Sequence, residues 1–117
     1  MKDYSSHFRN LVEMQLPDES RILTPRGGQD MMILVSWRLP ADAFRASKRS
    51  RMIRIVIEEA ALQDYARGSD AARLAGDERF GAWLRGQLSA FDPNHDSPLG
   101  VEPAPVTWPI GAHILNG

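Results

Sequence analysis

Residues 51–58, RMIRIVIE, carry the clearest strand pattern in the chain. Ile53, Ile55 and Ile57 alternate with a mixed row of side chains. β-Branched residues suit the pleated surface of a sheet, where their branched side chains pack against neighbours. The alternation therefore predicts a β-strand that buries its isoleucine row.

Two further β-compatible runs, residues 21–24 and 31–39, precede this strand. They flank residues 25–30, which contain Pro25, Gly27 and Gly28 and predict a hairpin turn in which glycine adopts a positive φ. The second run is apolar on both sides for half its length, which is typical of a central strand. The three runs predict a three-stranded antiparallel meander. Its second face carries Met32, Leu34, Met52 and Val56.

Apolar residues at helical spacing precede the predicted sheet. Residues 4–16 carry such a stripe, which predicts an amphipathic helix. Ser5 or Ser6 is expected to cap its start. Pro17 is expected to end it, because the residue before a proline is displaced from helical geometry.

Helical patterns also follow the predicted sheet. A short helix is expected from Glu59 to Gly68, and Ser69 is expected to cap a further turn. Gly76 and Asp77 predict a break, after which the longest apolar stripe begins. That stripe consists of Phe80, Trp83, Leu84, Leu88 and Phe91.

Residues 92–117 differ from the rest of the chain, because they hold five of the eight prolines and no Lys or Arg. They predict an irregular Pro-rich tail whose apolar residues pack on the body, as an edge strand interrupted at Pro109. The expected fold is a single α+β domain over residues 1–117. It contains an N-terminal helix, the meander, and two or three C-terminal helices packed on one sheet face, followed by the tail.

The composition excludes several classes of protein. The 117 residues are 43% hydrophobic and carry a net charge of -1, so the chain is no bulk polycation. The absence of cysteine excludes disulfides, thiolate metal sites and thiol nucleophiles. No apolar run approaches the ~18 residues that span a bilayer, and no secretory signal is visible. We therefore expect a cytoplasmic bacterial protein that does not act at a membrane.

One basic segment stands out: Arg45, Lys48, Arg49, Arg51 and Arg54, with no acid between them. Guanidinium groups in such a run could bind phosphates or a carboxylate-rich partner. The alternative is a solvated connector whose charge protects the following strand from edge pairing.

Metal and cofactor motifs are incomplete. Residues 92–96, DPNHD, have the alternating oxygen donors of an EF-hand loop, but Ser97 occupies the glycine position and Pro103 the position of the bidentate Glu. A helix stop followed by an Asx turn accounts for these residues. The glycines at 27 and 28 are not followed by a helix start and do not form a phosphate loop. We therefore expect no metal and no cofactor.

No catalytic signature is present either. The three histidines, His7, His95 and His113, fall in different predicted segments. Glu58 and Glu59 straddle a strand end, so their carboxylates are expected to point apart. The sequence thus favours a protein without enzymatic activity, although a fold can assemble a site from distant residues.

Two segments resemble a known family. Residues 47–51, SKRSR, lead into the isoleucine strand, and residues 91–96, FDPNHD, close the long helix. In these segments the chain is similar to small proteobacterial proteins classed as a domain of unknown function. The resemblance would cover most of the chain, and it implies no activity.

Two functions follow as expectations. The apolar second face of the predicted sheet favours a non-enzymatic protein-interaction module, with a protein partner or a second copy in a homodimer. The alternative is a binder of nucleic acid or another polyanion through the basic segment.

Overall fold

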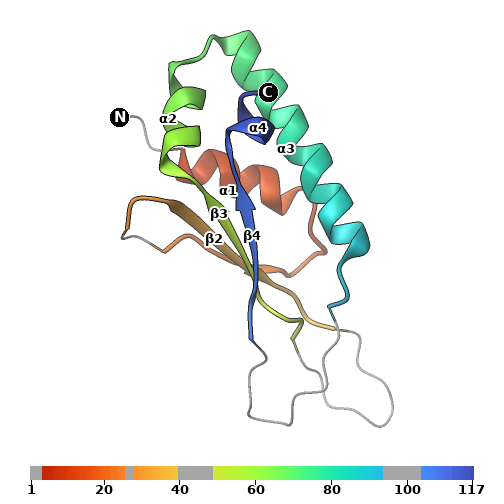
Figure 1. Ribbon diagram of the computed structural model, residues 1–117. Helices are drawn as coiled ribbons and strands as arrows, with labels where there is room; N and C mark the ends of the chain where they lie inside the picture. The colour runs from red at the N-terminus through yellow and green to blue at the C-terminus, as the bar shows by residue number, and fades with distance from the viewer. Residues whose placement is uncertain (1–3, 26–27, 40–48, 94–103) are drawn as a thin grey trace, which may run out of the picture.

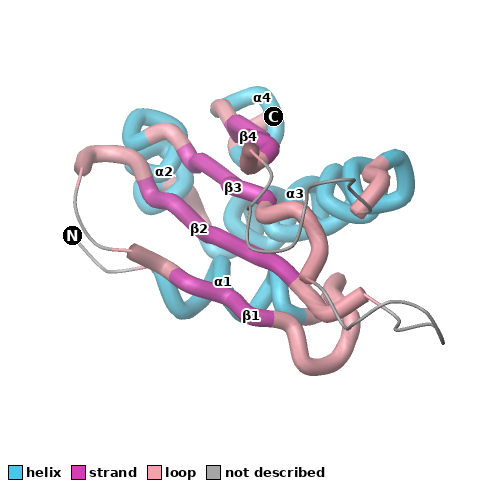
Figure 2. The backbone as a smooth tube through the Cα atoms, turned by 90° about the horizontal axis from the view of Figure 1, so that it is seen from below, coloured by secondary structure: helices cyan, strands magenta, loops and turns pink. Residues whose placement is uncertain are grey.

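The computed structural model describes residues 4–25, 28–39, 49–93 and 104–117. The fold is α+β, as predicted, with helices on one face of a mixed sheet (Figures 1 and 2). In chain order the elements are α1 (Ser5–Glu13), β1 (Arg21–Leu23), β2 (Met31–Ser36), β3 (Ile53–Ile57), α2 (Glu59–Arg67), α3 (Asp70–Ala90), β4 (Val106–Ile110) and α4 (Ala112–Leu115).

The predicted meander is present. β1, β2 and β3 are adjacent and antiparallel, with β2 between the other two, and Ile33 lies opposite Ile55. Gly28 in the connector between β1 and β2 has a φ of +82°, a backbone conformation that L side chains rarely adopt. The hairpin therefore connects the two strands between which the sequence predicted it.

The sheet has a fourth strand beyond the meander, at the edge where the tail was expected to pack, and it runs through Pro109 without the expected interruption. β4 pairs with β3 in parallel, with Val106 opposite Ile53 and Ile110 opposite Ile57. Pro109 lies in this edge strand, where a missing N–H does not interrupt pairing with a further strand. The C-terminal tail was expected to be irregular, but its residues 106–115 form β4 and α4.

The core lies between the sheet and the helices. Ile53, Ile55 and Ile57 are fully buried, as their alternation predicted. On α3, Phe80 and Leu84 are buried, whereas the other members of the stripe are partly buried and pack against the core. α1 covers the same side, because the ring of Phe8 lies 5.5 Å from that of Phe80.

The helices after β3 differ from those expected. Ser69 caps α3 as predicted, since its Oγ accepts a hydrogen bond from the backbone N–H of Ala72. The predicted break at Gly76 and Asp77 is wrong, and α3 runs without interruption through both. A Cβ at Gly76 would lie 2.5 Å from the carbonyl oxygen of Leu115. The glycine therefore permits close packing of α4 and does not end a helix.

The predictions for the start and the end of α1 are also wrong. The residue before the helix is Tyr4, and no side chain caps it, so neither Ser5 nor Ser6 has that role. The helix ends at Glu13, before Pro17, and tighter turns follow in which Leu16 N–H donates to the Glu13 carbonyl. These i→i+3 bonds satisfy carbonyls that the last helical turn leaves without partners.

Candidate functional site

One face of the sheet is covered by none of the described helices (Figures 1 and 2). The side chains there alternate with the buried rows, and the pairing register arranges them in two lines across the strands. We call this surface the open face. It consists of Leu23, Leu34, Arg54 and Thr107 in one line, and Met32, Val56 and Pro109 in the other.

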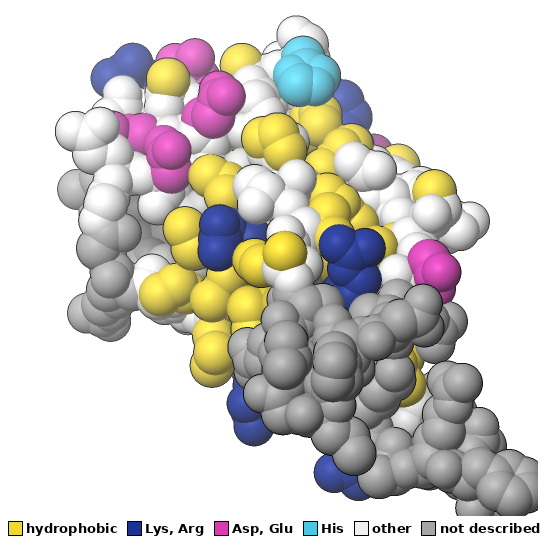
Figure 3. Space-filling view, turned by 60° about the horizontal axis from the view of Figure 1, so that its bottom comes forward, with side chains coloured by type: hydrophobic (Ala, Val, Ile, Leu, Met, Phe, Trp, Pro, Cys, Tyr) yellow, Lys and Arg dark blue, Asp and Glu magenta, His cyan; other side chains and the backbone are white. Residues whose placement is uncertain are grey.

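The open face is mostly apolar. Leu23 is 47% exposed, and Met32, Leu34 and Val56 are half-buried although they lie on the side away from the core. Figure 3 shows hydrophobic side chains gathered on this side of the molecule with basic side chains set among them. A contiguous apolar surface of this kind is typical of an interaction site.

Arg54 lies in the middle of the open face, between Leu34 and Thr107 in the register. Its Nε is buried and has no hydrogen-bond partner among the described residues. Leaving a buried donor unpaired costs about 1–3 kcal/mol, more for a charged group. The burial of this atom is therefore a cost that hydrogen bonds from the described residues do not offset.

Glu58 continues the alternation beyond the end of β3. Its backbone is extended, with φ -60° and ψ 138°, and its N–H donates to the carbonyl of Ile110. Its side chain therefore lies on the same side of the sheet as Arg54 and Val56, and it is exposed. Neither Glu58 nor Arg54 forms an ion pair with another described residue.

The structure does not assemble the basic segment into one anion-binding ridge in its described part. Arg45 and Lys48 lie outside the described residues. Arg49 binds Ser36 instead: its Nε and Nη2 donate to Ser36 Oγ at 3.1 and 3.0 Å, and Nη2 also donates to the Ser36 carbonyl at 3.0 Å. Arg51 is half-buried, and Arg54 belongs to the open face.

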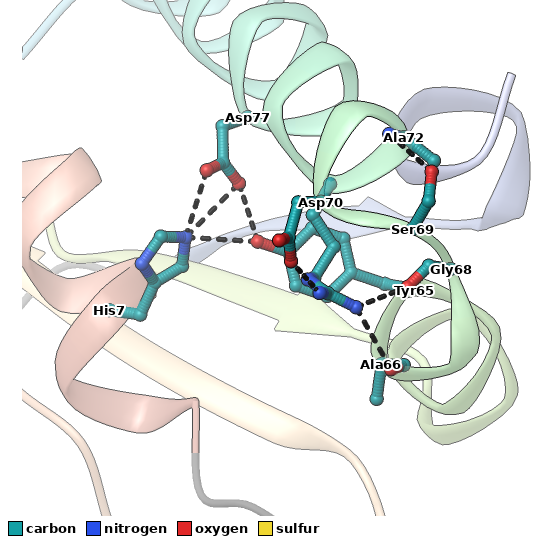
Figure 4. Close-up of polar contacts among 9 residues, drawn as sticks. His7, Tyr65, Ala66, Gly68, Ser69, Asp70, Ala72 and Asp77 are labelled. Carbon is teal, nitrogen blue, oxygen red and sulfur yellow. Dashed lines mark hydrogen bonds and ion pairs between the residues drawn. The ribbon is translucent and has the colours of Figure 1, made fainter.

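A polar cluster that the sequence did not predict joins three helices. His7 from α1, Tyr65 from α2 and Asp77 from α3 point toward one another (Figure 4). Tyr65 Oη donates to Asp77 Oδ1 at 2.7 Å, and His7 Nε2 lies 3.1 Å from both Asp77 carboxylate oxygens and 3.0 Å from Tyr65 Oη. No sequence motif indicates this cluster, because its members are up to 70 positions apart in the chain.

Burial raises the pKa of Tyr65 well above its ordinary value, and the hydrogen bond and negative charge of Asp77 raise it further. The phenol therefore stays protonated and donates to the carboxylate. A cavity of about 280 Å³ adjoins the cluster. Besides the cluster, it is lined by Tyr4, Asp70, Arg73 and Leu74.

The charged groups beside this cavity are bonded to the protein itself. Arg73 donates to the carbonyls of Ala66 and Gly68 and pairs with Asp70. With the hydrogen bonds inside the cluster, these contacts fasten α1 to α2 and α3. We therefore interpret the cluster of His7, Tyr65 and Asp77 as a set of contacts that stabilises the packing of these helices.

The remaining candidates add no site in the described part of the chain. Of the EF-hand-like stretch only Asp92 and Pro93 are described. Across the described ranges, no group of three His, Cys, Asp or Glu residues could hold a metal ion. Within those same ranges, no helix is long and apolar enough to cross a membrane.

The chain matches no protein-family model, no curated protein and no solved structure. Its functional interpretation therefore comes from its own geometry, in which the open face is the surface that lacks a partner among the described helices.

Proposed function

We propose that the protein is a protein-interaction module that associates with a second copy of itself through the open face. The observation that carries this proposal is a two-line apolar surface, left uncovered by the described helices, with Arg54 at its centre. Stacking two such faces places the sheets about 10 Å apart, and each buried Å² of apolar surface stabilises by about 25 cal/mol.

The expected interface is small. Four strands about 4.8 Å apart and five residues of about 3.3 Å each make a face of roughly 19 by 17 Å. A stable dimer usually buries about 800 Å² per partner, so we expect this one to be weak. Association must therefore be measured at high protein concentration.

The proposal is tested by sedimentation velocity between about 5 and about 500 µM protein, a range that extends to the high concentrations at which a weak dimer forms. We expect the weight-average mass of the wild type to rise toward that of a dimer. Val56→Lys should remain monomeric, because it places a charge in the apolar line. It should fold, since a lysine on this face can extend its ammonium to water in the monomer.

Leu74→Lys is the matched control. Leu74 is 61% exposed and lies on α3, away from the open face, so the same kind of substitution should leave self-association unchanged. A wild type that stays monomeric across the whole range would contradict the proposal. Equal loss of association in both variants would also contradict it, since the effect would then not belong to the open face.

A further inference from the structure

We infer that the two copies are related by a two-fold axis that passes over Val56 and runs across the strands, so that Arg54 of each copy faces Glu58 of the other. The inference rests on the proposed self-association and specifies its geometry. Its basis is the placement of Arg54 in β3 and of Glu58 just after β3 on the same face of the sheet, each two residues from Val56.

The symmetry follows from the order of the side chains. A two-fold axis between the sheets and perpendicular to β3 makes the two β3 strands antiparallel. Each residue then faces the residue at the same distance on the other side of the axis. With Val56 on the axis, the residue two positions before it faces the partner's residue two positions after it. Arg54 and Glu58 thus pair twice, and the two valines meet at the centre.

The other face-to-face arrangement is electrostatically worse. An axis parallel to the strands and over β3 places each β3 residue opposite its own copy, so the two Arg54 guanidinium groups would meet in an apolar interface. Like charges placed opposite one another in an interface repel and disfavour association. The antiparallel stacking removes this repulsion and supplies each guanidinium with a carboxylate.

Pairing within one chain is disfavoured by distance. Arg54 and Glu58 are four positions apart, roughly 13 Å in extended backbone, and the structure shows no ion pair between them. Between copies the gap is the sheet-to-sheet spacing of about 10 Å, which the long Arg side chain and the Glu side chain span together. The carboxylate of the partner's Glu58 would thus lie beside the Arg54 guanidinium group.

The test reverses each charge separately and then combines the two variants. Arg54→Glu alone and Glu58→Arg alone turn both inter-copy pairs into like-charge pairs, so each should weaken self-association at least about tenfold. An equimolar mixture of the two single variants restores both pairs in a heterodimer. The mixture should therefore associate within about threefold of the wild type, while each variant alone stays monomeric.

Circular dichroism on each variant separates loss of folding from loss of pairing. If either single reversal unfolds the chain, the double variant Arg54→Glu/Glu58→Arg carries the test, because it preserves both pairs and should self-associate like the wild type. A double variant that folds but stays monomeric would refute the arrangement.

The outcomes also distinguish this inference from the proposed function. If the wild type self-associates and Val56→Lys does not, but folded single reversals still associate normally, the open face is the interface and the Val56 axis is wrong. If the wild type is monomeric, both fail. If Glu58→Arg has no effect while Arg54→Glu abolishes association, a carboxylate other than that of Glu58 pairs with Arg54, and the inferred axis is overturned.

Discussion

At the scale of single residues, Tyr65 links stability to pH. A raised pKa in the folded state means that the folded protein holds the phenolic proton more tightly than the unfolded chain does. The resulting stabilisation is complete below the ordinary tyrosine pKa of about 10 and is lost as the pH rises through the folded pKa. Above pH 10 we expect the free energy of unfolding to fall by up to about 1.4 kcal/mol per pH unit from this group.

The measurement is urea denaturation at several pH values for the wild type and Tyr65→Phe. The variant keeps the ring that contacts Tyr4 and Phe8, with centroids 5.2 Å away in both cases, and removes only the titrating hydroxyl. The stability difference between the two proteins should be constant near neutral pH and should shrink above pH 10. Parallel curves throughout would show that Tyr65 does not carry the effect.

At the scale of elements, two of the three glycines of α3, Gly76 and Gly86, provide a matched pair. Gly76 is buried against α4, and a Cβ there would meet the carbonyl oxygen of Leu115 at 2.5 Å. Gly86 lies in the same helix with nothing within 4 Å of such a Cβ. Gly76→Ala should destabilise by about 1–3 kcal/mol, as overpacking does, whereas Gly86→Ala should stabilise by about 0.5–1 kcal/mol through helix propensity.

Urea titration of both variants decides whether the contact of α4 with α3 is as close as described. α4 is also held through its C-terminal carbonyls, since Arg79 donates to Ile114 O at 2.8 Å and to Leu115 O at 2.9 Å. The backbone of α4 therefore cannot retreat from a new methyl group without losing these bonds. Equal, stabilising effects at both glycines would show that α4 is not packed there.

At the scale of the whole molecule, self-association should make stability depend on concentration. A folded dimer in equilibrium with unfolded monomers is favoured by mass action, so the urea midpoint of the wild type should rise between about 5 and about 500 µM protein. Val56→Lys, which should not associate, should show no such rise. A wild-type midpoint that is independent of concentration would mean that the open face adds nothing to stability.

The sequence by itself determined the elements that arise from local patterns. The alternation in β2 and β3, the glycine-rich turn between β1 and β2, the Ser69 cap and the stripe around Phe80 each depend on neighbours within a few positions. Strand and helix periods are visible at that range, which is why the α+β class and the meander could be predicted.

Only the tertiary structure decided the features that join distant segments. β4 pairs in parallel with β3 although a long stretch of chain separates them, and Gly76 has the local context of a helix break but is required by α4. The contacts among His7, Tyr65 and Asp77, and the buried unpartnered Nε of Arg54, likewise have no counterpart in any local pattern. The physical reason is that such contacts are set by packing between elements, whereas periodicity along the chain reports only which side of an element is apolar.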